Sequence, residues 1–155
     1  GIIECIVINM PAGVGEPLFD SLDADLAKAL FCVPAVKGVE FGTGFKSAEL
    51  KGSENNDAFI IRSGKIVTET ENAGGIIGGL STGVPIMIRV AIKPTPSIAK
   101  EQKTVDLSKM QNTLITIKGR HDPCVVPKAV PAIEAVVAIT LIDHLIRLGR
   151  VPKVL

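Results

Sequence analysis

The chain has 155 residues, 46% of them hydrophobic, and this combination suits one globular domain with a sizeable core. Lys and Arg together number 17 against 16 for Asp and Glu, so the net charge of +1 creates no global field that would attract nucleic acid or an anionic membrane. The sequence has no Trp or Tyr and only five Phe, which removes the platforms on which bases stack, and we expect neither nucleic acid nor a membrane as a partner.

The first predicted element is a strand over residues 2–9 that ends at Pro11. Both of its alternating faces are largely apolar, which indicates a strand covered on two sides. The sequence enters this strand at its second residue, without Met, and an unpaired strand edge requires a neighbour. We therefore expect that a segment preceding this chain completes the domain.

Residues 13–30 predict an amphipathic helix that ends before Pro34, because four leucines recur at a spacing of four: Leu18, Leu22, Leu26 and Leu30. Acidic residues early in this stretch suit the positive end of the helix dipole. Residues 36–41 then predict a strand. Residues 51–59 are polar and contain too little apolar side chain to belong to a core.

A hairpin is predicted next, over residues 60–69, where two β-rich runs flank Ser63 and Gly64. Glycine at this place supplies the positive φ that tight hairpin turns require. Residues 84–92 then predict another strand, with one apolar and one mixed face.

The last third of the sequence begins with a polar connector over residues 98–112 and a short predicted strand over 114–119. Residues 131–149 predict a helix, with a proline in its first turn and a glycine at its end. This helix is apolar on almost every face, so we expect it to be buried from several sides. Its longest apolar run, residues 135–142, falls short of the roughly 20 residues that span a bilayer. The mixed order of strands and helices favours an α+β fold over a doubly wound parallel sheet.

The glycine-rich stretch 72–79, NAGGIIGG, is the first candidate site. Paired glycines let backbone N–H groups approach a phosphate or a flavin closely. The spacing is neither that of a dinucleotide-binding fingerprint nor that of a P-loop. Tight backbone packing beside a helix also explains these glycines, so this signal alone does not establish a site.

Two further stretches carry reactive or anion-binding groups. Residues 93–97, KPTPS, offer an ammonium and two hydroxyls on a loop stiffened by proline, which suits either a phosphate or a plain exit turn. In RHDPC, Arg120 could contact a phosphate or carboxylate with two N–H groups, and His121 or Asp122 could move a proton. A structural salt bridge between Arg120 and Asp122 is the alternative.

The cysteines are odd in number, widely spaced and without a CxxC pair, which argues against a disulfide framework or zinc knuckle and favours a reducing cytoplasm: Cys5, Cys32 and Cys124. We expect no metal site, because the possible ligands match no familiar zinc spacing: His121, Asp122, Cys124 and His144. The thiol of Cys124 is expected to be buried and inert, and His144 to make a structural hydrogen bond.

Six segments, in this order, resemble the C-terminal half of chorismate synthase: residues 13–30, 34–45, 52–57 (GSENND), 72–83, 93–97 and 119–124 (GRHDPC). The resemblance runs nearly from end to end of the chain, and its motifs are long and unrelated to generic folds. It implies a layered β-α-β sandwich with a buried C-terminal helix, and a homotetramer in the cytoplasm when the chain is complete.

The resemblance also implies a reaction. The family is a carbon–oxygen lyase of the shikimate pathway, which leads to the aromatic amino acids. It converts 5-enolpyruvylshikimate 3-phosphate to chorismate and phosphate by 1,4-anti elimination, and it requires reduced FMN without net redox change. The alternative function is a non-catalytic anion- or nucleotide-binding module, and a purely structural interaction domain is a third possibility that excludes flavin binding.

Site residues follow by matching this sequence to the family motifs. The implied FMN contacts are Pro34, Ala35, Gly78, Lys93, Pro94, Thr95, Pro96, Ser97 and Arg120. Arg120 would clamp an anionic group of cofactor or substrate, Asp122 would be the catalytic carboxylate that takes a proton from flavin N5, and His121 would position the loop. The histidine- and arginine-rich motifs of the N-terminal half have no counterpart in residues 1–155, so we expect this C-terminal portion by itself to be inactive and to bind FMN weakly.

Overall fold

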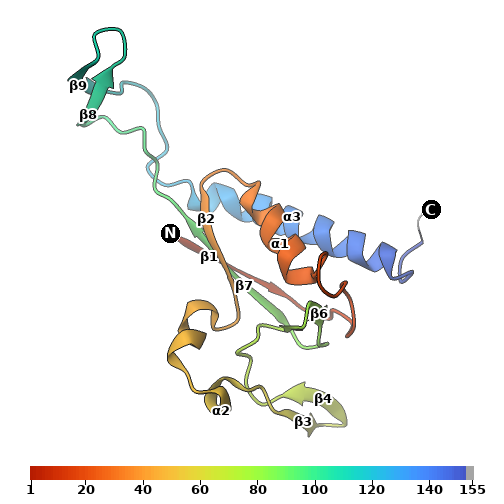
Figure 1. Cartoon of the computed structure of the whole chain (residues 1–155). Helices are drawn as coiled ribbons and strands as arrows, with labels where there is room; N and C mark the ends of the chain where they lie inside the picture. The colour runs from red at the N-terminus through yellow and green to blue at the C-terminus, as the bar shows by residue number, and fades with distance from the viewer. Residues whose placement is uncertain (153–155) are drawn as a thin grey trace.

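Strand β7 (Ile86–Ile92) is the centre of the molecule, and β1 (Ile2–Val7) and β2 (Val36–Phe41) pair with it on either side, both antiparallel. Helices α1 (Leu22–Phe31) and α3 (Val126–Arg147) lie together over one face of this sheet (Figure 1). The arrangement confirms the predicted α+β class and places the predicted strand 36–41 at its predicted bounds.

The core lies between β7 and the two helices. The predicted apolar face of β7 is buried throughout: Ile86, Ile88, Val90 and Ile92. These side chains pack in one cluster with residues of both helices: Leu22, Leu26 and Leu30 from α1, and Ile133, Val137 and Leu141 from α3. Burial of this apolar area is the main favourable term in folding, so β7 and the two helices fix the frame on which the loops are carried.

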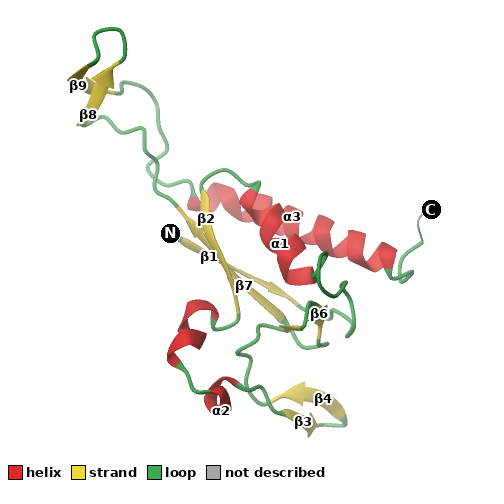
Figure 2. Cartoon of the chain, viewed as in Figure 1, coloured by secondary structure: helices red, strands yellow, loops and turns green. Residues whose placement is uncertain are grey.

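The other face of the sheet is open. The computed structural model describes residues 1–152, and within them no helix layer covers this face, as Figure 2 shows. Ile2 and Ile6 point to that side and are 68% and 54% exposed, whereas Ile3 on the opposite side is buried. The expectation of a first strand covered on both sides is therefore wrong within the described residues.

Helix α1 begins later than predicted. It runs from Leu22 to Phe31, and its first predicted leucine, Leu18, has a φ of +77° and is 85% exposed. Pro17 precedes Leu18 and disfavours continuous helix there, so the four-residue spacing overran the true start. The helix ends before Pro34, as predicted.

Between β2 and β7 the chain forms short elements, namely the 3₁₀ helix η1 (Gly44–Glu49), α2 (Gly52–Asn55), β3 (Phe59–Arg62), β4 (Lys65–Thr68), β5 (Ile76–Ile77) and β6 (Leu80–Ser81). Strands β3 and β4 pair as the predicted hairpin, and Ser63 and Gly64 form its turn with φ of +53° and +74°. Two successive positive φ values are those of the tight turn that matches strand twist.

The predicted polar connector 98–112 is wrong. Strands β8 (Glu101–Asp106) and β9 (Gln111–Thr116) pair as a hairpin that stands away from the sheet (Figure 1). Its turn is held by the Asp106 carboxylate, which accepts hydrogen bonds from the Ser108 hydroxyl at 2.6 Å and the Ser108 N–H at 2.9 Å. These bonds, with one from the Lys109 N–H, lower the pKa of Asp106.

Helix α3 also differs from prediction. It begins at Val126, so Pro131 lies inside it rather than in its first turn, and it ends at Arg147 before Gly149. It is buried along one stripe that ends at His144, while Ile139 on another side is exposed. Burial from several sides is thus not found among residues 1–152. By length and composition alone this helix could cross a membrane, and one stripe of it packs against α1 and β1.

Candidate functional site

Two of the candidate loops meet beside the N-terminus of α3. Residues 93–97 follow β7, and residues 120–124 precede α3. The Thr95 hydroxyl donates a hydrogen bond of 3.1 Å to the Asp122 carbonyl oxygen. No local sequence pattern places these loops together, because the two partners are 27 positions apart in the chain, with the β8–β9 hairpin between them.

Residues 34–35 join the same end of the sheet. The Lys93 N–H donates to the Ala35 carbonyl oxygen at 2.9 Å, where β2 and β7 lie side by side. Ala35 has a φ of +73°, a left-handed conformation that is uncommon for a residue with a Cβ. The structure therefore brings together three of the segments that the sequence singled out.

The side chains at this end are available to a ligand. Lys93, Pro94, Pro96 and Arg120 are exposed, whereas Thr95 and Ser97 are half-buried. Neither Lys93 nor Arg120 forms an ion pair within residues 1–152. Asp122 pairs instead with Lys128, whose Nζ lies 2.6 Å from its Oδ2. The alternative of an Arg120–Asp122 salt bridge is not what the chain forms.

Gly78 lies elsewhere. It occupies the turn between β5 and β6, at the end of the sheet where β7 begins. The glycine loop bonds to the start of β7 and Thr95 follows its end, and a strand of seven residues spans about 20 Å, so Gly78 and Thr95 are at opposite ends of β7. Within one copy of residues 1–152, the glycine loop 72–79 and the loop 93–97 therefore do not line a common pocket.

The glycines of the 72–79 loop divide into two kinds. Three are buried so tightly that an added Cβ would collide with a neighbour: Gly74 with Gly42 N at 2.2 Å, Gly75 with Pro85 O at 2.4 Å, and Gly79 with Ser21 Cβ at 2.6 Å. Gly78 is exposed, and no described atom lies within 4 Å of the Cβ position there. Close backbone packing, the alternative reading, accounts for the three buried glycines, and only Gly78 leaves its backbone open to a ligand.

The GSENND segment anchors the start of this loop through Asp57. Its Oδ1 accepts from the Thr70 hydroxyl at 2.6 Å and the Asn72 N–H at 2.9 Å, and its Oδ2 accepts from the Ala73 N–H at 2.8 Å. Burial alone would raise the pKa of Asp57, but these hydrogen bonds together lower it. The sequence marks this segment as polar and as one of the six that resemble the family, but it does not indicate this contact. The one sequence feature that could have indicated the contact between Asp57 and the glycine loop is the acidic residue 15 positions before Asn72, where that loop begins.

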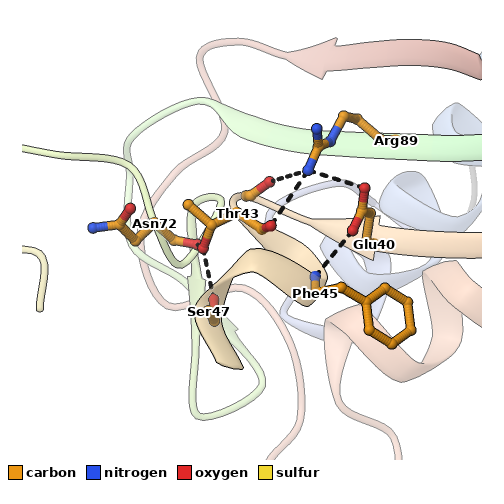
Figure 3. A network of polar contacts seen from close by, with 7 residues as sticks. Glu40, Thr43, Phe45, Ser47, Asn72 and Arg89 are labelled. Atoms are coloured by element: carbon orange, nitrogen blue, oxygen red, sulfur yellow. Dashed lines mark hydrogen bonds and ion pairs between the residues drawn. The ribbon is translucent and has the colours of Figure 1, made fainter. Parts of the chain in front are cut away.

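A second set of contacts holds the loop from the side of β2 (Figure 3). The Asn72 carbonyl oxygen accepts two hydrogen bonds from Thr43, from its N–H at 2.9 Å and its hydroxyl at 3.0 Å. Arg89 on β7 pairs with Glu40 at 2.9 Å and donates to the Thr43 carbonyl oxygen at 3.3 Å. The network is therefore continuous from the central strand to the glycine loop.

Comparison with known proteins identifies the family. A family model described as chorismate synthase matches residues 1–146. The chain belongs to the chorismate synthase family. It is 60% identical to a chorismate synthase of Methanosarcina barkeri over 96% of this chain and 41% of that relative. It is 55% identical to a chorismate synthase of Dehalococcoides mccartyi over the whole of this chain and 43% of the relative.

The fold agrees with the family assignment. A crystal structure of a chorismate synthase superposes with a TM-score of 0.74 at 31% identity, covering 95% of this chain and 37% of the other. The chain thus has the chorismate synthase type of α+β fold, in which residues 1–152 form a three-stranded sheet with α1 and α3 over one face. It spans about two fifths of the length of the chorismate synthases that it matches.

Two of the cysteines and histidines of this chorismate synthase family member, His121 and Cys124, lie in the loop 120–124, and the others lie outside the site loops. His144 is 2% exposed and its Nε2 lies 3.0 Å from Asp25 Oδ2, so its hydrogen bond ties α3 to α1. Cys124 is exposed, which corrects the expectation of a buried thiol. Burial, and then the nearby Glu134, raise the pKa of Cys5. No cluster of three or more metal-ligand side chains occurs in the part of the chain that the structure describes.

Proposed function

We propose that this chain is the C-terminal portion of a complete chorismate synthase. The complete enzyme would convert 5-enolpyruvylshikimate 3-phosphate to chorismate and phosphate by 1,4-anti elimination, with reduced FMN, in the cytoplasm and as a homotetramer. Membership of the family over nearly the whole chain supports this proposal, together with the coverage of about two fifths of each relative. The missing length would supply the rest of the substrate cage.

The observation that carries the proposal is the hydrogen bond between Thr95 and Asp122. It holds the cofactor loop against the loop that bears the proposed proton acceptor. Lys93 and Arg120 are exposed cations without ion-pair partners among residues 1–152, and they suit an anionic cofactor and a phosphorylated substrate. Asp122 would accept a proton at its carboxylate, close to the bound ligands.

The chemical groups that these residues offer are of the types that bind reduced FMN. The open backbone at Gly78 can approach a flat or anionic group, and the loop 93–97 offers hydroxyl and ammonium donors. Pro34 and Ala35 would line the cofactor beside Lys93. When bound, reduced FMN supplies electron density as the bond to the leaving phosphate breaks. Because Gly78 lies at the far end of β7, a single copy of this chain offers only part of the contact set, and we expect the isolated chain to bind FMN weakly and to be inactive.

Arg120→Ala tests the binding role in the complete enzyme. Loss of one charged, hydrogen-bonding partner is expected to weaken the affinity for reduced FMN or for the substrate by roughly tenfold to a hundredfold. Anaerobic titration followed by flavin absorbance would measure the affinity for reduced FMN. The KM would report the change for the substrate. Arg62→Ala, which removes an exposed arginine on the β3–β4 hairpin, is the matched control. Unchanged affinity for both ligands in Arg120→Ala would contradict the assignment.

A further inference from the structure

Lys128 makes a contact with the proposed proton acceptor that the sequence did not indicate. Its Nζ lies 2.6 Å from Asp122 Oδ2, the shortest ion pair among residues 1–152. The two side chains are 70% and 49% exposed. An exposed pair of this kind contributes little to folding stability, because solvent screens it and both side chains lose freedom. The short contact therefore calls for an explanation other than stability.

The position of Lys128 in α3 leads to the same conclusion. It lies in the first turn of a 22-residue helix that has no acidic residue in that turn. The positive end of the helix dipole favours acidic residues there and disfavours a lysine. Helix stability thus gives no reason for a cation at this place, whereas the adjacent Asp122 carboxylate does.

Asp122 is held at two points. The Thr95 hydroxyl donates to its main-chain carbonyl oxygen, and Lys128 holds Oδ2 of its side chain. In the part of the chain that the structure describes, Oδ1 accepts no hydrogen bond and joins no ion pair. One carboxylate oxygen is therefore fixed and the other remains free to accept a proton.

We propose that Lys128 is a positioning residue for the reaction, which fixes the Asp122 carboxylate so that Oδ1 takes the proton. This inference rests on the proposed function. In the step, an O–H bond forms at Oδ1, and the bond between the proton and its donor on the bound cofactor breaks with the electron pair left on the donor. Asp122 becomes a neutral carboxyl group, and Lys128 keeps its own proton and charge. Its charge offsets that of the carboxylate before the transfer.

Lys128→Gln in the complete enzyme tests the proposal. We expect kcat to fall about tenfold, while the affinity for reduced FMN and the substrate KM change less than about twofold, because only the orientation of Asp122 is lost. Lys128→Arg should restore most of kcat, since a guanidinium also reaches the carboxylate. The matched control is Lys109→Gln, which removes a lysine of similar exposure that pairs with Asp106 at 3.9 Å. It should leave kcat unchanged.

The double variant shows whether Lys128 acts through Asp122. Adding Lys128→Gln to Asp122→Asn should lower kcat no further than Asp122→Asn alone. An equal tenfold fall in both backgrounds would overturn the proposal, as would a normal kcat in Lys128→Gln beside an impaired Asp122→Asn. Normal turnover in Asp122→Asn would instead refute the proton-accepting role of Asp122, and with it the role of Lys128.

Discussion

Asp122→Asn in the complete enzyme is expected to lower turnover at least about a hundredfold, while the affinity for FMN stays within about twofold. The amide has nearly the same shape as the carboxylate but cannot accept a proton. The main-chain carbonyl oxygen that receives the Thr95 hydrogen bond is unchanged by the substitution. Anaerobic formation of chorismate and flavin titration measure the two quantities.

The control for this experiment is Asp106→Asn on the β8–β9 hairpin. Asp106 also carries a carboxylate near a lysine, half-buried in this case, but its hydrogen bonds serve its own turn. Full turnover is expected for this control. Should Asp122→Asn turn over normally, Asp122 would be excluded as the proton acceptor. Loss of FMN affinity in parallel with turnover would favour the non-catalytic binding role for this loop.

Among the substitutions proposed for this protein, Gly42→Ala is expected to lower the free energy of unfolding the most. A Cβ at Gly42 would lie 2.1 Å from the Asn72 carbonyl oxygen and 2.4 Å from Gly74 N, and the φ there is +55°. Left-handed backbone strain and a collision with main-chain atoms together are expected to lower the free energy of unfolding by about 3 kcal/mol or more. Denaturant unfolding of the complete enzyme, followed by circular dichroism, measures the change.

Gly64→Ala is the matched control for that substitution. Gly64 has a φ of +74° in the β3–β4 turn, but no described atom lies within 4 Å of its Cβ position. Strain alone should lower the free energy of unfolding by about 1 kcal/mol. If Gly42→Ala fails to fold, its soluble yield relative to Gly64→Ala replaces the unfolding measurement. Equal stability of the two variants would show that the contact between Gly42 and the glycine loop is not close.

The elements that could be predicted are those set by local chemistry. Strand β2 follows from a β-rich run between breakers, and the β3–β4 hairpin follows from Ser63–Gly64, because a tight turn requires positive φ. In β7, alternate residues form the predicted apolar face, and these are the residues that are buried. Of the β8–β9 hairpin, only the end of β9 overlaps a predicted strand, the one over residues 114–119. Strand β8 was missed because it is mostly polar and carries no apolar period. The start of α1 was predicted too early because the leucine spacing continues back past Pro17 to Leu18. The start of α3 was predicted too late because Pro131, which lies inside the helix, was read as a first-turn residue.

The site could be predicted only in part. Motifs pointed to the loops 93–97 and 120–124, but the bond between Thr95 and Asp122 depends on how β7 and α3 are packed. No local rule separates Gly78 from the three glycines that close packing requires. The pairing of Asp122 with Lys128 rather than Arg120 likewise follows from the start of α3 at Val126, five residues earlier than the sequence suggested.

The most direct test of the central claim is an anaerobic assay of the complete enzyme with 5-enolpyruvylshikimate 3-phosphate, reading both released phosphate and chorismate. We expect equal amounts of the two products when reduced FMN is present and none without it. We expect no product from residues 1–155 assayed alone. Absence of both products from the complete enzyme with reduced FMN, or chorismate formation by residues 1–155 alone, would contradict the account.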